Sequence, residues 1–253
     1  MKANEQVFLR KIQRMLESDA ADKESIIKEL DALKDNIKRQ MRGDDVKQAD
    51  AVLNVDLLFD DDDVLGADDT VVLRRIHECD FDIFKDLIYE TTYIPKENVE
   101  EFIAETWRDY YRPMRAYAAI FNHQREFIGY CGIKNIYTEV PEIAIEILER
   151  HQCSGYGSHA VKVFVDNVKE KCGVDTYRIR TDADNYISQA LFERMGAVPD
   201  GISDFFLLSD EEKEEEEKEN AHLLDEKICA VAKKFGVKPE LLLSHVLEYR
   251  LVV

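Results

Sequence analysis

The chain has 253 residues, of which 45% are hydrophobic, and it carries a formal net charge of −19 at pH 7. This length suits one domain of ordinary size with appendages, or two small domains. The negative charge disfavours nucleic acid as a main partner, because phosphates would be repelled. No stretch approaches the ~20 apolar residues of a membrane span, so we expect no membrane partner either.

The negative charge is concentrated in two short runs. Residues 56–69 hold seven Asp and no basic residue, and residues 209–219 hold eight acidic residues against two lysines. Charge runs are usually solvated chain, so we interpret 44–69 and 209–219 as acidic linkers. The run from 60 to 63 lacks the alternating ligands, central Gly and terminal Glu of a calcium loop.

The five cysteines are scattered and form no Cys-x-x-Cys pair. This favours free thiols in a reducing compartment over disulfides or structural zinc. The first residues are charged and amphipathic, without the apolar segment of a secretory signal. We therefore expect a cytoplasmic protein. His151 and Cys153 lie close in sequence, but two ligands without a third make no metal site, so we expect no metal.

Residues 1–43 are predicted to form a helical hairpin. Apolar residues recur at spacings of three and four, and a polar break at 18–22 divides them into two helices. Such a hairpin cannot bury its apolar stripe alone. We expect it to dock on the main domain; docking on a second copy or another partner is the alternative.

Residues 70–208 alternate between strand and helix patterns. In chain order they predict a strand at 70–76, helices at 80–90 and 96–110, strands at 115–122, 126–136 and 142–148, a helix at 158–171, a strand at 176–181, a helix at 185–195 and a strand at about 204–208. Consecutive strands imply antiparallel pairing, and the later strand-helix-strand unit implies a parallel pair. We therefore predict an α/β (α+β) fold whose mixed, mostly antiparallel sheet has helices on both faces.

The strand at 142–148 and the turn after it stand out. Alternation places Ile143, Ile145 and Ile147 on one face, and Glu142, Ala144, Glu146 and Leu148 on the other. Gly155 and Gly157 then lead into a helix. A helix that starts directly after a strand presents unpaired backbone N–H groups, which suit a phosphate.

Two common phosphate fingerprints are absent, because the chain has neither a Gly-Lys-Ser/Thr tripeptide nor three suitably spaced glycines at this turn. The segment from Gln152 to Gly157 instead resembles Gln/Arg-x-x-Gly-x-Gly/Ala, the acyl-CoA loop of the GNAT acetyltransferase superfamily. The segment 184–197 is similar to the same family's Asn-x-x-Ser/Ala…Leu-Tyr/Phe-Glu-Lys-x-Gly-Phe pattern, and the element order also agrees. The resemblance covers about residues 70–208.

The resemblance implies acetyl-CoA as co-substrate. It would lie along the central strand, with its pyrophosphate on the loop amides. A main-chain amide of that strand would polarise the thioester carbonyl. The cofactor-binding residues implied are Ile147, Leu148, Glu149, Gln152, Cys153, Ser154, Gly155, Tyr156 and Gly157, with Asn185 and Ser188 from the last helix.

An acceptor ammonium must lose a proton before it attacks, so a carboxylate base is needed. Glu142 begins a Glu-Ile-Ala segment that looks like the family's Glu-x-Gly, and we prefer it; Glu146 lies closer to the expected thioester. Both also fit the wet face of a half-buried strand. Phe192 stands where many members carry a proton-donating tyrosine, and Tyr186 is a weak substitute.

Residues 220–253 are predicted to form a second helical hairpin. A helix at 223–235 ends at Gly236, and Pro239 opens another. The pair superficially resembles a helix-turn-helix, but leucines occupy the place of a recognition helix's polar residues, so DNA binding is disfavoured.

The leading hypothesis from the sequence is an N-acetyltransferase that transfers acetyl directly to a primary amine of a small molecule or peptide. The alternative is an interaction or regulatory protein on the same scaffold, which works through its helical ends with little or no catalysis. Phe192 and the two appended hairpins favour the alternative, and the intact loop opposes it.

Overall fold

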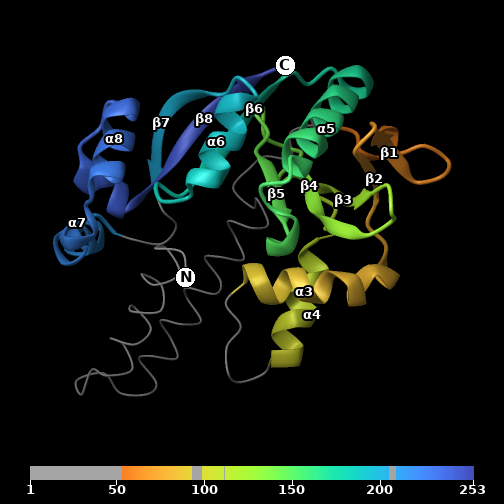
Figure 1. Cartoon of the computed structure of the whole chain (residues 1–253), viewed down its shortest axis with the longest axis horizontal. Coiled ribbons are helices and arrows are strands. Elements are labelled where there is room, and N and C mark those ends of the chain that lie inside the picture. The colour runs from red at the N-terminus through yellow and green to blue at the C-terminus, as the bar shows by residue number, and fades with distance from the viewer. Residues whose placement is uncertain (1–52, 93–98, 111, 205–208) are drawn as a thin grey trace. The chain divides into compact units, whose positions relative to one another are not determined.

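The computed structural model describes residues 53–92, 99–110, 112–204 and 209–253 (Figure 1). Its main helices and strands are, in order, β1 (Val64–Ala67), β2 (Val71–Arg75), α3 (Phe81–Thr91), α4 (Val99–Asp109), β3 (Ala116–Asn122), β4 (Phe127–Ile133), β5 (Ile143–Ile147), α5 (Tyr156–Cys172), β6 (Thr176–Thr181), α6 (Tyr186–Arg194), β7 (Val198–Asp204), α7 (Asp210–Glu219), α8 (Glu226–Phe235) and β8 (His245–Val252). The predicted order of strands and helices from residue 70 to β7 is confirmed.

The strands form two sheets. Strands β1 to β5 form an antiparallel sheet in chain order, and a second sheet has the order β6-β8-β7. The chain also divides into two compact units: residues 50–180, 186–198 and 249–253 belong to the larger, and 181–185 and 199–248 to the smaller. The five-stranded sheet lies entirely in the larger unit.

Helices α3 and α4 cover one face of the five-stranded sheet (Figure 1). Their apolar stripes meet an aromatic cluster in which the ring of Phe84 lies 5.0 Å from Trp107 and 4.5 Å from Phe127, centroid to centroid. Phe84 is fully buried. Ala144 and Leu148 of the central segment belong to this cluster, so the predicted alternation along β5 is confirmed on this face.

Helix α5 covers the opposite face. Its buried residues include Ala160, Val161 and Phe164, as the helical spacing predicts. The buried thiol of Cys131 on β4 contacts the carbonyl oxygen of Ala160 at 3.7 Å. Cys131 pairs with Ile145 in the β4–β5 register, so the isoleucine face of β5 points to α5.

Strand β5 meets β6 at one point. A parallel bridge joins Glu142 to Arg178, and beyond it β5 pairs with β4 in the first sheet, whereas β6 belongs to the second. The predicted parallel pair is therefore one bridge and not a ladder. Glu142 is only 4% exposed, and its two oxygens contact Lys134 Nζ at 2.5 Å and Arg180 Nε at 2.8 Å.

Both segments that we interpreted as linkers contain regular structure. Within 44–69, residues Val64–Ala67 form β1, whose outer edge has no partner strand among the described residues. Within 209–219, Asp210–Glu219 forms α7. Ser209 caps α7 through a capping box with Glu212, which explains why an acidic run makes a helix. The acidic residues of its first turn also suit the positive end of the helix dipole.

The prediction of a helical hairpin at 220–253 is correct for its first helix only. Helix α8 forms as predicted and ends at Gly236, which has φ 67°. The prediction of a second helix is wrong. Pro239–Leu243 form a short 3₁₀ helix, and strand β8 follows it. In β8 the buried residues Leu247, Tyr249 and Leu251 recur with period two. The last predicted strand, at about 204–208, lies earlier as β7, Val198–Asp204, and 205–208 are outside the described residues.

The predicted N-terminal hairpin, 1–43, also falls outside the described residues, and the domain boundaries stay predictions. Within the described part of the chain, no helix combines the length and apolar character needed to cross a bilayer.

Glu142→Gln should lower the free energy of unfolding. Removing one partner of a buried ion pair leaves the others uncompensated; because Lys134 stays partly in water, we expect a loss of about 2–3 kcal/mol at pH 7. Urea unfolding followed by circular dichroism measures it. Asp166→Asn is the matched control, because its ion pair with Lys162 is exposed and should contribute less than about 0.5 kcal/mol.

The same comparison should depend on pH. Burial alone would raise the pKa of Glu142, but Lys134 and Arg180 outweigh it and hold the pKa below its ordinary value of 4.5. A carboxyl with a lowered pKa stabilises the fold above 4.5 and loses this contribution as pH falls further. The difference between the native chain and Glu142→Gln should therefore shrink below pH 4.5; a constant difference contradicts the ion-pair explanation.

Candidate active site

The segment between β5 and α5 is a tight loop with two residues in left-handed backbone conformations. Cys153 has φ 57° and Gly155 has φ 87°. Gly155 is the residue immediately before α5. The left-handed conformation suits glycine and costs other residues energy. Gln152, Cys153, Ser154 and Gly155 are all exposed, so the loop faces solvent as a ligand site requires.

Five successive backbone amides of this loop have no acceptor among the described residues. They belong to Cys153, Ser154, Gly155, Tyr156 and Gly157; the next two amides, of Ser158 and His159, both donate to the carbonyl of Gly155. Alternating backbone conformations that bring several N–H groups together form an anion-binding concavity, and the positive end of α5 strengthens it. The residues present therefore fit a diphosphate, as the sequence predicts.

Side chains of the loop hold it in place. The Gln152 side chain donates from Nε2 to the carbonyl of Ile147 at 2.8 Å, which ties the loop to the end of β5. Ser154 Oγ donates to the carbonyl of Gln152 at 3.2 Å. Tyr156 packs its ring edge-on against His151 at 6.0 Å. Gln152 and Ser154 thus support the loop's shape through their side chains, and any ligand contact falls to the amides.

The two glycines differ in role. A methyl group on Gly155 would project into open space, whereas one on Gly157 would lie 3.4 Å from Leu191 Cδ2 and 3.6 Å from Ile145 Cδ1. A side chain at Gly157 would therefore point at the apolar neighbours and not at a ligand. From the sequence alone, a side chain at either glycine would be expected to keep a ligand away from the backbone; at Gly157 this is wrong, and its apolar neighbours explain why Gly or Ala suits this position of the resembling motif.

Two of the amides that could polarise a thioester, those of Leu148 and Glu149, already have acceptors. The amide of Leu148 donates to the carbonyl of Ile128 at 2.9 Å, within the sheet. The amide of Glu149 donates to Glu90 Oε2 at 2.8 Å, an exposed contact. The side chain of Leu148 is fully buried. Of these two amides, that of Glu149 is held by an exposed side chain that a ligand can displace, and that of Leu148 is held within the sheet.

The two candidate bases have different surroundings. Both oxygens of buried Glu142 are taken by Lys134 and Arg180, and these charges lower its pKa despite burial. Such a carboxylate is a poor proton acceptor near neutral pH. Glu146 is half-buried on the same strand face and lies directly opposite Tyr130 in the β4–β5 register. The contacts therefore favour Glu146 over Glu142 as the candidate base, which is the opposite of the order that the sequence suggests.

Three tyrosines surround the Glu146 side of the sheet, and sequence reasoning missed them. Tyr110 and Tyr117 each pack against Tyr130 with ring centroids 4.9 Å apart. Burial raises the pKa of all three hydroxyls, and the charge of Glu146 raises each further. These phenols therefore stay protonated. The only sequence signal for them is the predicted hairpin at 115–136, which contains Tyr117 and Tyr130.

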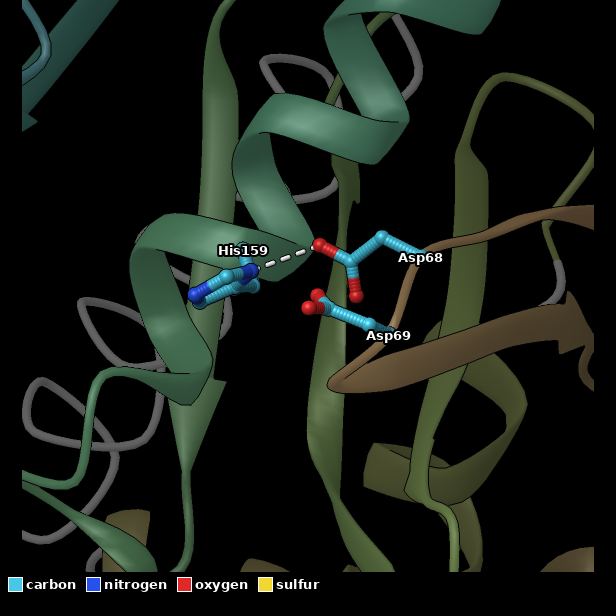
Figure 2. Close-up of side chains that lie close together, drawn as sticks. All are labelled: Asp68, Asp69 and His159. Atoms are coloured by element: carbon cyan, nitrogen blue, oxygen red, sulfur yellow. Dashed lines mark hydrogen bonds and ion pairs between the residues drawn. The ribbon is translucent and has the colours of Figure 1, made fainter.

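A second polar group lies at the first turn of α5. Figure 2 shows Asp68 and His159 pointing toward each other, and Asp68 Oδ2 lies 2.6 Å from His159 Nδ1. The amides of Thr70 and Val71 donate to the other oxygen of Asp68. Burial alone would raise the pKa of Asp68, but these hydrogen bonds outweigh it and lower the pKa. The contact ties the β1–β2 turn to α5.

Asp69 completes a group of three side chains whose ligand-type atoms lie within 4.8 Å of one another. No sequence spacing indicates this group, because Asp68 and His159 are 91 residues apart. The hydrogen bond between His159 and Asp68 accounts for the contact without an ion. The expectation of no metal stays a prediction.

Two predicted cofactor-binding residues belong to this part of the chain, Asn185 just before α6 and Ser188 within it. Ser188 is one turn before Leu191 on α6, and Leu191 adjoins Gly157, so Ser188 shares the helix face that meets the start of α5. Asn185 belongs to the smaller compact unit, and its role stays a prediction. Phe192, which stands where many family members carry a tyrosine, is 2% exposed and belongs to the core.

The family model described as "Acetyltransferase (GNAT) domain" matches residues 70–198. No curated protein matches the chain by sequence. Among solved structures, the apo RimL ribosomal L7/L12 alpha-N-protein acetyltransferase is 14% identical with a TM-score of 0.52, covering 75% of this chain and 94% of its own. A spermidine N-acetyltransferase SpeG chimera from Vibrio cholerae and hSSAT is 14% identical with a TM-score of 0.50, covering 72% and 95%. These structures are similar in fold.

Gly155→Ala should weaken acetyl-CoA binding by about tenfold or more. A left-handed backbone costs an L-residue roughly 1–2 kcal/mol, and relief of that strain moves the amides apart. Gly157→Ala is the matched control; it meets only ordinary contacts and should leave the affinity unchanged. Isothermal titration measures both, and equal losses in the two variants contradict the assignment of the amides as the binding element.

Proposed function

We propose, since the chain belongs to the GNAT acetyltransferase family, that it transfers an acetyl group from acetyl-CoA to a primary amine. The observation that carries the proposal is the run of five amides without acceptors, from Cys153 to Gly157, at the end of a strand that also bears Glu146. Strand β5 thus carries a carboxylate and is followed directly by a candidate anion-binding loop.

In this proposal the loop amides bind the diphosphate of acetyl-CoA. The positive end of α5 adds to the attraction, which matters in a chain whose net charge of −19 would otherwise repel an anion. Gln152 keeps the loop attached to the end of β5 through Ile147. Ser188 lies on the side of α6 that meets this region and is a candidate for the CoA arm.

Bound acetyl-CoA supplies the activated acetyl group, whose carbonyl carbon forms a bond to the amine nitrogen as its bond to sulfur breaks. The chain's own part is to take up the proton that the acceptor ammonium must lose. We assign that proton to Glu146, directly or through a water molecule, because it is half-buried on the face shared with Tyr130. Tyr110, Tyr117 and Tyr130 help to shape this face.

Glu142 has a positioning role in the same proposal. Its contacts with Lys134 and Arg180 join β5 to β6 at the bridge, so they set the direction in which β5 leaves that point. Phe192 has no proton to donate to the departing thiolate. A CoA thiolate is a fair leaving group, so we expect solvent to protonate it.

The acceptor is proposed only as a class. One structural neighbour is named for a ribosomal protein and the other for spermidine, so both a peptide amine and a small-molecule amine are candidates here.

Glu146→Gln should lower kcat/KM for acetyl transfer by roughly 100-fold or more, the usual contribution of a general base. The rise of the native rate with pH, which reports deprotonation of the base, should disappear. The measurement is thiol release from acetyl-CoA over an amine panel. Acetyl-CoA affinity, followed by titration, should stay within about twofold, since the loop amides are untouched.

Two outcomes contradict parts of the proposal. An unchanged rate and pH profile in Glu146→Gln removes Glu146 as the base. Absence of acetyl-CoA binding to the native chain excludes the proposed acetyltransferase activity. The alternative hypothesis, an interaction protein on the same scaffold, is then favoured.

A further inference from the structure

A cavity of ≈ 570 Å³ opens in the larger unit, at the start of β3. Its wall comes from the segment before β1, the end of β2 and the turn between α4 and β3. Among the lining residues are Arg75, Arg112, Arg115, Tyr110 and Tyr117. Pockets of this size hold small ligands or a few residues of a peptide.

Arginines are the main charged residues that line this cavity. Among the described residues that line it, three are arginines and one, Asp56, is acidic; Asp63 pairs with Arg75 from outside the lining. Arg112 and Arg115 share one carboxylate, that of Asp109, at 2.6 Å and 3.7 Å. One carboxylate does not take up all the N–H donors of two guanidinium groups, so donors remain for the oxygens of a ligand.

Two of the three arginines are also held in position. Arg115 donates to the hydroxyl of Tyr117 at 3.3 Å and lies over its ring at 5.3 Å. Arg75 donates to Asp63 at 2.9 Å and lies over Phe59 at 4.3 Å. Arg112 is 40% exposed and can turn toward a ligand. Fixed guanidinium groups match the geometry of carboxylates and phosphates better than mobile lysines do.

The cavity shares a wall with the proposed acceptor site. Tyr110 and Tyr117 line it and both pack on Tyr130, which lies opposite Glu146. Tyr110 and Tyr117 therefore connect the wall of the cavity to the surroundings of Glu146.

We propose that this cavity binds an oxyanion, a carboxylate or a phosphate, carried by the acceptor amine itself. The inference rests on the proposed acetyltransferase function and narrows its substrate class to amines that also bear an anionic group. Arg112 and Arg115 are the specificity-determining residues, and the amine end of the same molecule faces Glu146.

The first test compares matched acceptors at saturating acetyl-CoA with the full chain. The pairs are β-alanine and β-alaninamide, phosphoethanolamine and ethanolamine, and dipeptides with a free or an amidated C-terminus. The anionic member of at least one pair should have a KM about tenfold or more lower, the usual effect of a charge-assisted hydrogen bond. Equal KM values within every pair, or a preference for the neutral members, overturn the inference.

Variants locate the effect. Arg112→Gln should remove the preference for the anionic member while kcat for the neutral member stays within about twofold. Arg108→Gln, an exposed arginine of α4 outside the cavity, should keep the preference. Arg112→Lys keeps the charge opposite Asp109 and should retain part of the preference, so it answers the question if the glutamine variant fails to fold. Loss of the preference in Arg108→Gln overturns the assignment.

A second readout does not depend on turnover. Phenylglyoxal labelling followed by mass spectrometry should show Arg112 protected by the anionic compounds and not by their neutral partners, with Arg108 labelled equally in all samples. If the anionic compounds protect Arg112 but the chain does not bind acetyl-CoA, the anion site is supported and the proposed enzymatic activity is excluded. Acetyl-CoA binding without protection of Arg112 keeps the enzyme and removes the anion site.

Discussion

The buried ion pairs of Glu142 are the contact on which the geometry of the site depends. Glu142 sits at the single bridge between β5 and β6, and two cations, one before β5 and one on β6, compensate its charge. An ion pair at this depth costs desolvation, so its net stabilisation is modest. Its importance lies in placement, because it joins two strands that otherwise belong to different sheets.

From that point β5 carries two different surfaces. One faces α5 through its isoleucines, and the other faces the aromatic cluster under α3 and α4. The loop that follows β5 is exposed, and its amides at the start of α5 have no acceptor among the described residues. In the proposed function, β5 sets the distance between the loop, which would bind the diphosphate of acetyl-CoA, and Glu146, near which its thioester would lie.

Local patterns in the sequence were sufficient for most of the fold. Period-two alternation identified the two faces of β5, and helical spacing identified α5. The pattern failed where two signals compete. Leu241 to Leu243 resemble a helix, yet the alternation from Leu247 to Leu251 prevails and makes β8. The acidic run at 210–219 has the composition of solvated chain, yet it forms a helix, because Ser209 and Glu212 form a capping box at its start.

The site was less predictable because its decisive contacts join distant parts of the chain. That Glu142 and Glu146 share a face follows from the strand period, but the partners that distinguish them do not. Arg180 lies 38 residues from Glu142, and its approach depends on how β6 is placed. The tyrosines around Glu146 come from β3, β4 and the end of α4, and only the folded core brings them together.

The hydrogen bond between Asp68 and His159 has a consequence for ligand capture. It anchors the first turn of α5 to the β1–β2 turn, while Gln152 anchors the other end of the loop to β5. The donor groups between these two anchors are thus arranged before any ligand arrives. Little conformational entropy remains to be lost on association, so a larger share of the electrostatic attraction appears as affinity.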